Sequence, residues 1–487
     1  MAYCLSHQKN KMSLSETLPS DIRRRHRKMY AIAFTAAIGG FLFGYDLSLI
    51  GAANIYLKDQ FHLSEQALGF ATGSASLGCV FGPFLGAWLC DAIGRERTML
   101  VAAGLLAIGA TLTAMAPNIA VFNAFRLAGG VGVGLCSVAS PMYIAEMAPS
   151  NMRGKLGLMY QFAIVAGSTA APLIAYVLVR TLPDTLCWRW MFASQTFVVL
   201  IFAVFLLRLP PSPRWLAQKG RTDESLAALT KVHGRENARL ELDEIQASLA
   251  EEQGGIAELF QPGIRYALVI GLLLAFFNNW TGWSMMGGYI PMLFQMAGVQ
   301  QRHAAILEFS FTYLAMAVWT VVAMALVDRL GRRPLWIWAS IGMAIITAAT
   351  GMVFHYQLHG AVILLVITLC TIPHGLAIGP LPWLMMSEIF PTRIRAKAVA
   401  VTTTFLWLTI YSGTQFFPMM ISWSKAAIGS AGGAFWVFTA VSCLSALFGW
   451  RMLPETKSRT LEDIARSWHR EPAPVLPASA SDAGTKI

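Results

Sequence analysis

The chain has 487 residues, of which 56% are hydrophobic and 13% are charged. An average soluble protein is about 45–50% apolar and about 25% charged, so a water-soluble fold of this length would lack the polar side chains to cover its surface. This composition excludes a disordered chain, a collagen-like chain and a small disulfide scaffold, and it indicates an all-α polytopic membrane protein. Seven scattered cysteines without a Cys-x-x-Cys pair predict neither a metal site nor a disulfide framework.

The chain begins with a polar, basic segment, 1–28, which is not followed by the short apolar run and cleavage site of a signal peptide. Twelve later stretches are apolar over the roughly 20 residues that a spanning helix needs. Six form the expected N-terminal bundle, 29–207, and six the expected C-terminal bundle, 265–450. The expected spans are 29–52, 66–89, 98–116, 119–145, 156–180, 188–207, 265–297, 303–327, 334–355, 360–386, 397–422 and 429–450.

One long polar segment, 208–264, separates the two bundles. Within it, Asp223–Val232 and Asn237–Glu252 place apolar residues at helical spacing among charges, which predicts short amphipathic helices on the membrane surface. The polar tail, 451–487, ends in a stretch rich in Pro, Ala and Ser, which is typical of disorder. The chain has no Walker-type phosphate loop, metal-spaced His/Cys cluster or Ser nucleophile motif, so no enzymatic activity, cofactor or ATP-driven transport is expected.

The net charge of +11 suggests a nucleic-acid-binding protein until the 37 Lys and Arg residues are placed. If the N-terminus is cytoplasmic and the chain alternates sides, 31 of them fall in the inner loops and tails and 5 in the outer loops. This bias follows the positive-inside rule and predicts a multi-pass cell-membrane protein with both termini in the cytoplasm. The positive charge is therefore topological, and no nucleic-acid partner is expected.

Three patterns recur 237 to 244 residues apart. An Asp-x-x-Gly-Arg sequence follows the second and eighth spans, a Glu-x-x-Pro-x-x-x-Arg sequence follows the fourth and tenth, and a Leu-Pro pair closes the sixth and twelfth. Repetition of this kind indicates two six-helix halves with one plan, as in many secondary transporters. A helical membrane protein without transport function can also arise by duplication.

These residues also carry a family resemblance over nearly the whole chain. They include Gly44-Tyr45-Asp46, Arg126-x-x-Gly129-Gly-x-Gly132, Pro213-Arg214-Trp215-Leu216, Gly379-Pro380-x-Pro382-Trp383 and Pro454-Glu455-Thr456-Lys457. In this order, the motifs resemble those of the major facilitator superfamily and, within it, the sugar porter family. The resemblance implies two pseudo-symmetric six-helix bundles that move a sugar or sugar-like polyol across the membrane by alternating access.

Asp46 and Arg126 are the most deeply placed charges of the first half. An ionised side chain within a span costs several kcal/mol unless it is paired or hydrated, so mutual compensation is expected. One interpretation is a permanent ion pair that joins two helices. The resemblance implies the other interpretation, in which Asp46 takes up the transported proton and Arg126 is its partner. A carboxylate whose arginine moves away in one conformation binds a proton more readily there.

Charged residues after the second, fourth, eighth and tenth spans form a second set. Charges at the inner ends of helices are usually solvated topology markers, but here their spacing repeats in both halves. The resemblance implies that salt bridges between these loops clamp the inner side shut. The candidate gate residues are Asp91, Arg95, Glu146 and Arg153 in the first half and Asp328, Arg332, Glu388 and Arg395 in the second.

The solute is expected at mid-membrane between the halves, on helices one, four, five, seven, ten and eleven. A polyol needs amide groups that donate and accept hydrogen bonds, and aromatic faces for its C–H bonds. Residues of this kind can also be lipid-facing tryptophans or helix–helix contacts. The candidate binding residues are Gln161, Asn278, Asn279, Ser284, Tyr289, Trp383 and Trp407.

The seventh span departs from the resemblance. Sugar porters usually carry Gln-Gln-x-x-Gly-Ile-Asn there, whereas this chain has Asn278-Asn279-x-x-Gly282-Trp283-Ser284. The polar side chains are shorter, so the substrate of the family does not carry over with its fold. A non-hexose polyol, a larger glycoside and a small organic acid remain open.

The leading hypothesis is therefore a proton-coupled symporter that works as a monomer on a sugar-like solute. The alternatives are an uncoupled facilitator, in which Asp46–Arg126 is structural, and a transporter-like nutrient sensor, for which the tail offers little room. Two further ionisable residues, Glu308 and His374, are candidates for a second proton site or a solute contact. The alternative is that Glu308 reaches the water outside and that His374 is a neutral residue that packs between helices.

Overall fold

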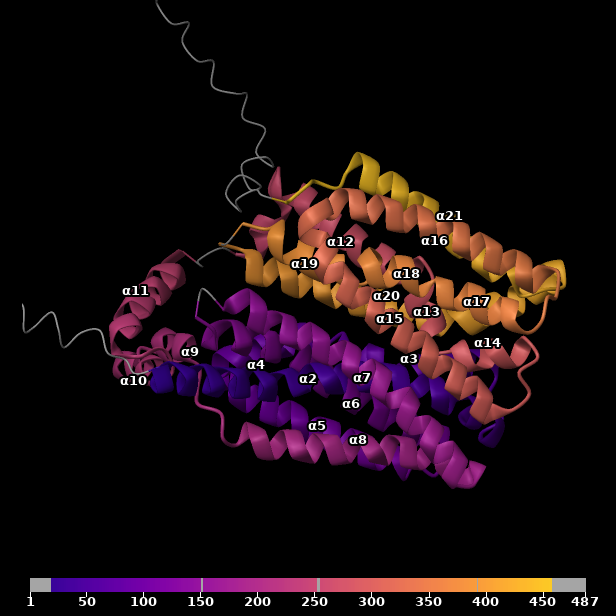
Figure 1. Cartoon of the computed structure of the whole chain (residues 1–487), viewed down its shortest axis with the longest axis horizontal. Coiled ribbons are helices and arrows are strands. Elements are labelled where there is room, and N and C mark those ends of the chain that lie inside the picture. Colours follow the sequence, from indigo (N-terminus) through magenta and orange to yellow (C-terminus); the bar gives the residue numbers. More distant parts are fainter. Residues whose placement is uncertain (1–18, 150–151, 252–254, 392, 458–487) are drawn as a thin grey trace, which may run out of the picture.

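The computed structural model describes residues 19–149, 152–251, 255–391 and 393–457, and within them the regular structure is helical, without strands. Two sets of long, roughly parallel helices lie one above the other (Figure 1). One set comes from the first half of the chain and the other from the second half. A group of short helices lies at one end of this bundle, here named the linker end; the opposite end is named the far end.

The first set contains six spans. Ser64 and Asn118 cap two of its helices by accepting hydrogen bonds from the backbone N–H groups of Ala67 and Val121, which explains where α3 and α6 begin. The second span is divided at Val80–Phe81 into α3 and α4. The bounds are α2 Pro19–Gln60, α3 Glu65–Cys79, α4 Gly82–Ile93, α5 Arg95–Ala114, α6 Ile119–Met147, α7 Arg153–Thr181 and α8 Asp184–Leu206.

The linker between the sets is helical, and it forms the group at the linker end (Figure 1). Its helices α10 and α11 occupy the two stretches in which amphipathic helices were expected. Leu229 of α10 and Ala238 and Leu242 of α11 form a small apolar core between them. The bounds are α9 Pro213–Gln218, α10 Thr222–His233, α11 Arg235–Glu251 and the 3-10 helix η1 Ile256–Phe260.

The second set contains the other six spans, two of which are interrupted. The seventh breaks at Gly282, whose φ of +120° is accessible to glycine and strained for other residues. The tenth contains a π-helical turn, η2. The bounds are α12 Ile264–Trp280, α13 Trp283–Gly287, α14 Ile290–Met296, α15 Arg302–Leu330, α16 Arg332–His355, α17 Ala361–Leu369, α18 Thr371–Pro373, η2 His374–Ile378, α19 Pro380–Glu388, α20 Arg395–Ile428 and α21 Gly432–Arg451.

Ten helical stretches of the described residues are long and apolar enough to cross a membrane. The interrupted seventh span, α12 to α14, and the 34-residue helix α20 complete the twelve. The fold is thus an all-α membrane protein of two six-helix bundles. The interruption of the seventh span and the division of the second were not expected from hydropathy.

Glycines bring helices of the first bundle into backbone contact. A Cβ atom at Gly44 of α2 would lie 1.9 Å from the carbonyl oxygen of Ile164 in α7, and one at Gly167 would lie 2.0 Å from that of Phe41. Membrane helices associate through such close approaches because lipid supplies little hydrophobic driving force between them. The contact fixes α2, which carries Asp46, against α7, which carries Gln161.

Candidate solute cavity and charged networks

A cavity of about 190 Å³ lies between the two bundles, midway along their helices. The first bundle contributes Phe43 of α2, Thr72 of α3 and Gln161 of α7, among others. The second contributes residues of the broken seventh span, of α15, of the π-helical tenth span and of α20. Because both bundles supply its walls, any rocking of one bundle against the other changes its shape and access.

Five of the seven candidate binding residues line this cavity: Gln161, Asn278, Asn279, Ser284 and Trp383. The other two lie elsewhere. Tyr289 is buried and its hydroxyl donates to the carbonyl oxygen of Thr414 at 2.8 Å. Trp407 is fully buried against Phe43, with ring centroids 5.2 Å apart. Both sit on the expected helices, but their side chains pack inside the protein instead of facing the cavity.

The two asparagines also hold the broken helices together. Asn278 donates its Nδ2 to the carbonyl oxygens of Ile378 and Gly379 at 2.6 and 3.2 Å, and so ties the seventh span to the π turn of the tenth. Asn279 donates to the hydroxyl of Thr409 at 2.8 Å, while its Oδ1 is buried without a partner. An unpartnered acceptor beside a cavity is available to a solute hydroxyl.

The expectation that helix four contributes to the cavity is wrong, since the lining includes no residue of α6. The second and eighth spans contribute instead, through Thr72 and Ser76 of α3 and Tyr313 and Thr320 of α15. These two helices occupy equivalent positions in the two halves, and the internal repeat could have identified them as a pair.

The cavity offers polar groups among apolar ones, and no charge. None of the described residues that line it is Asp, Glu, Lys or Arg. His374 lines it from the π turn, 8% exposed, and its Nδ1 has no hydrogen-bond partner. Its ring lies 6.0 Å from that of Trp283, the residue that stands where sugar porters usually have Ile. Glu308 does not line the cavity, and its Oε2 is buried without a partner in α15.

Asp46 and Arg126 meet inside the first bundle. Both are 4% exposed, and the guanidinium Nη1 donates to Asp46 Oδ1 at 2.5 Å. The contact is single, because Asp46 Oδ2 and Arg126 Nε and Nη2 are buried without partners. The ring of Phe192 lies 5.2 Å from the guanidinium carbon. On α2 the carboxylate is one turn from Phe43 and Ile50, which both line the cavity.

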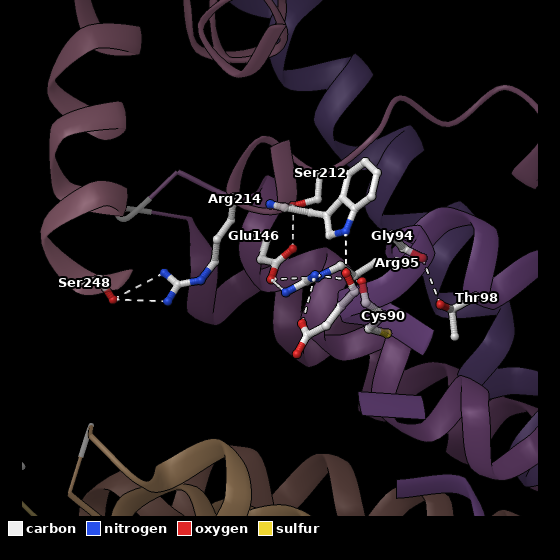
Figure 2. Close-up of polar contacts among 10 residues, drawn as sticks. Cys90, Gly94, Arg95, Thr98, Glu146, Ser212, Arg214 and Ser248 are labelled. Atoms are coloured by element: carbon white, nitrogen blue, oxygen red, sulfur yellow. Dashed lines mark hydrogen bonds and ion pairs between the residues drawn. The ribbon is translucent and has the colours of Figure 1, made fainter. Parts of the chain in front are cut away.

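At the linker end, Glu146 of α6 is the centre of a buried network (Figure 2). It accepts hydrogen bonds from Arg95 Nε at 3.0 Å and from the hydroxyl of Ser212, and it forms an ion pair with Arg95 Nη2 at 2.9 Å. Arg95 also donates to the carbonyl oxygen of Cys90 at 2.9 Å. Asp91 is largely exposed and contacts Arg95 at 3.5 Å. The network thus ties α4, α5 and α6 to the start of the linker.

The second bundle repeats this arrangement. Glu388 accepts from Arg332 Nη2 at 3.1 Å and from the hydroxyl of Thr456 at 2.6 Å. Thr456 follows the twelfth span as Ser212 follows the sixth. Asp328 contacts Arg332 at 3.1 Å from an exposed position. The internal repeat of the sequence is therefore also a repeat of contacts.

These ion pairs join residues of the same bundle, not residues of opposite bundles as the clamp hypothesis expected. Arg395 donates its Nε to the carbonyl oxygen of Phe390 at 3.2 Å within its own half, and the side chain of Arg153 lies outside the described residues. Glu258 of η1 pairs with Arg393. Hydrogen bonds from the backbone N–H of Gly255 and from Arg393 lower the pKa of Glu258.

The far end holds polar contacts between the bundles. Arg302 of α15 forms ion pairs with Asp59 at the end of α2 and, at 2.9 Å, with Asp184 at the start of α8. Asn54 donates to the carbonyl oxygen of Gly288 at 2.6 Å, also across the interface. The interface is closely packed here, since a Cβ at Gly51 would lie 2.9 Å from the ring of Phe309. These contacts hold the two bundles together between the cavity and the far end.

Two six-helix bundles with an uncharged cavity between them define a membrane transporter of the major facilitator type. Neither the fold nor the cavity is that of an enzyme. The chain belongs to the family of sugar (and other) transporters, whose family model matches residues 32–468.

Curated relatives agree with this assignment. An arabinose-proton symporter of Bacillus subtilis is 36% identical over 92% of this chain and 97% of its own length. A D-xylose-proton symporter of Escherichia coli is 35% identical over 91% and 96%. A glucose facilitated diffusion protein of Zymomonas mobilis is 31% identical over 90% and 97%.

Solved structures agree as well. The proton:xylose symporter XylE bound to 6-bromo-6-deoxy-D-glucose is 34% identical, with a TM-score of 0.77 over 90% of this chain and 99% of that chain. An inward open conformation of the xylose transporter XylE from E. coli is 33% identical, with a TM-score of 0.78 over 90% and 100%.

Proposed function

We propose that this protein is a proton-coupled symporter of a neutral sugar or sugar-like polyol, which it moves by alternating access. The solute binds in the cavity between the bundles, where Gln161, Asn278, Asn279 and Ser284 offer hydrogen bonds and Trp383 offers an aromatic face. The single observation that carries the proposal is the pairing of this uncharged cavity with a buried, singly bonded Asp46–Arg126 pair one helical turn away.

The solute is neutral because the described lining offers no cation to a carboxylate and no anion to an amine. A buried charge without a partner costs several kcal/mol, so a sugar acid would bind poorly in such a cavity. Amide and hydroxyl groups that both donate and accept are the complement of a polyol. This argument disfavours the small organic acid that the sequence left open.

Asp46 is the proton site. Its Oδ2 has no partner in the described structure, and its only ion pair is a single contact with Arg126. Movement of Arg126 away from the carboxylate would leave a buried charge uncompensated, and protonation removes that cost. Phe43 and Ile50 share a helical face with Asp46 and line the cavity, so solute binding and the proton site act on the same segment of α2.

The relatives support the coupling, since the arabinose and xylose transporters that this chain resembles are named as proton symporters. The similarity to a facilitated diffusion protein favours one second candidate, an uncoupled facilitator with a structural Asp46–Arg126 pair. In this proposal the linker end and both termini are cytoplasmic, which the excess of Lys and Arg in the loops and tails of that side supports. The protein functions as a monomer in the cell membrane, because each chain contains a complete cavity and proton site.

The test is uptake by the purified chain in proteoliposomes, with labelled pentoses, hexoses, inositols and sugar acids, with and without an imposed pH gradient. We expect an inward proton gradient to drive accumulation of a neutral solute. Asp46→Asn abolishes gradient-driven accumulation but keeps solute exchange at zero gradient, because the solute cavity does not include Asp46.

The matched control is Asp223→Asn, an exposed carboxylate of α10, which keeps full accumulation. Uptake by the unaltered chain that ignores the gradient would favour the facilitator. Binding without uptake would favour a sensor, and transport of a sugar acid in preference to neutral sugars would contradict the assignment of the cavity.

A further inference from the structure

A second cavity, of about 760 Å³, lies at the linker end, outside the transport pathway. It is enclosed by the first span, by the end of the sixth span and by two helices of the linker. No described residue lines both this cavity and the solute cavity. Its lining is Lys28, Ala31, Ile32, Phe34 and Thr35 of α2, Phe205, Arg208, Leu209, Pro210 and Pro211 around the end of α8, Leu216 of α9, and Glu224, Ala227 and Ala228 of α10.

One side of this cavity continues into the surface that faces the bilayer. Phe34 is 59% exposed and Phe205 is 38% exposed, and both belong to membrane spans. Exposed aromatic side chains in a span are in contact with lipid. The apolar wall of the cavity is therefore open to the acyl chains of the bilayer.

Among the described residues that line the cavity, two cations, Lys28 and Arg208, lie at the rim. Both are exposed, and the structure gives neither of them an ion-pair partner among the described residues. Along α2 the apolar wall lies deeper than the charge, since Phe34 is six residues, or about 9 Å, beyond Lys28. At the end of the sixth span, Phe205 comes about one turn before Arg208, so this ring also lies deeper in the membrane than the charge. Each helix thus presents a cation at headgroup depth and a ring at acyl-chain depth.

Glu224 is the one carboxylate among the described lining residues, and an arginine outside the lining compensates its charge. Arg221 donates its Nε and Nη2 to the two oxygens of Glu224, at 2.7 and 2.6 Å. This contact lowers the pKa of Glu224, so the carboxylate remains ionised and paired. The net charge that the described lining offers to an occupant is therefore that of Lys28 and Arg208.

We propose that this cavity binds an anionic glycerophospholipid of the cytoplasmic leaflet. Its phosphate lies between Lys28 and Arg208, and one acyl chain lies along Phe34 and Phe205. Basic pockets at the cytoplasmic ends of membrane helices suit such headgroups. Since α2 carries Asp46, a lipid seated here connects the helix of the proton site to α8 and to the linker. The inference does not depend on which solute is transported.

The test is native mass spectrometry of the full-length protein in detergent, titrated with phosphatidylglycerol or with zwitterionic phosphatidylethanolamine. We expect one tightly bound phosphatidylglycerol per chain. The double variant Lys28→Ala/Arg208→Ala weakens that binding about 30-fold, the factor that corresponds to two lost charges at a membrane surface. Ala227→Trp, which fills the cavity from the exposed face of α10, weakens it while both charges remain.

The matched control is Lys219→Ala/Arg451→Ala, which removes two exposed cations of the same end that do not line the cavity. This variant keeps the affinity of the unaltered chain. Three results would overturn the proposal. They are an equal loss of phosphatidylglycerol affinity in the two double variants, binding of phosphatidylethanolamine as tight as that of phosphatidylglycerol, and displacement of the bound lipid by millimolar inorganic phosphate. Melting temperatures of all variants show whether a loss of binding reflects loss of the fold.

Discussion

At the scale of single residues, the cavity holds polar atoms that the protein itself does not satisfy. Asn279 Oδ1 and His374 Nδ1 are buried without hydrogen-bond partners, and both residues line the cavity. An unmade hydrogen bond in a buried place costs about 1–3 kcal/mol, which a bound solute or water recovers. These two residues are therefore where substitutions separate solute binding from stability.

His374→Phe tests this separation. We expect the KM for the transported solute to rise about three- to tenfold, the effect of one lost hydrogen bond, with little change in melting temperature. The control is His355→Phe at the far end, where Nδ1 lies 3.1 Å from the hydroxyl of Ser430. That change lowers the melting temperature and leaves KM unaltered. An unchanged KM in His374→Phe would identify His374 as a packing residue.

At the scale of helices, the position of each span follows from hydropathy, but the face that a side chain presents does not. Tyr289 and Trp407 satisfy every chemical requirement for a solute contact, and both pack into the protein. Thr72 and Ser76 look unremarkable in the sequence, and both line the cavity. Rotation of a helix about its axis is set by partners distant in the chain, which one sequence does not reveal.

The interruptions of the seventh and tenth spans also depend on partners that are distant in the chain. Gly282 and the π turn at His374–Ile378 lie inside long apolar runs, so hydropathy predicts unbroken helices there. What stabilises the break is the pair of hydrogen bonds from Asn278 to Ile378 and Gly379. The Asp46–Arg126 contact was predictable by contrast, because two buried charges of opposite sign within one bundle have few other ways to be compensated.

The glycine contact between α2 and α7 yields a prediction at this scale. Gly167→Ala should destabilise the protein by about 1–3 kcal/mol, because its Cβ would lie 2.0 Å from the carbonyl oxygen of Phe41. Gly104→Ala in α5 is the control, since nothing lies within 4 Å of a Cβ there. Thermal unfolding in detergent should show a clear drop for the first variant only. Equal melting temperatures would mean that α2 and α7 separate easily.

At the scale of the whole molecule, the two bundles behave as bodies whose charged networks are internal. Arg95–Glu146 and Arg332–Glu388 each stabilise one bundle, whereas Arg302 joins α15 to α2 and α8 across the interface at the far end. The equilibrium between conformations in which the far end is open and those in which it is closed therefore depends on Arg302 more directly than on the networks at the linker end.

Arg302→Ala should shift the population toward an open far end. The assay is modification of Ser284→Cys, a cavity residue, by a membrane-impermeant maleimide added from the far side. We expect labelling to rise about two- to fivefold, the shift that an exposed ion pair supports. Lys58→Ala is the control, since Lys58 pairs with Glu65 of its own bundle at 2.8 Å. Equal labelling in both variants would contradict a role for Arg302 in closure.

The π turn of the tenth span gives this half of the molecule a change of helical register. Its closing hydrogen bond runs from the N–H of Gly379 to the carbonyl oxygen of His374, at 2.8 Å. Conversion of that turn to α-helical pairing would advance the following helix by one residue, a rotation of about 100° and a translation of about 1.5 Å. Trp383 would then leave the cavity wall. A solute that competes for the Nδ2 of Asn278 would release the carbonyls that hold this register, so occupancy of the cavity and the screw motion of one helix would be a single event.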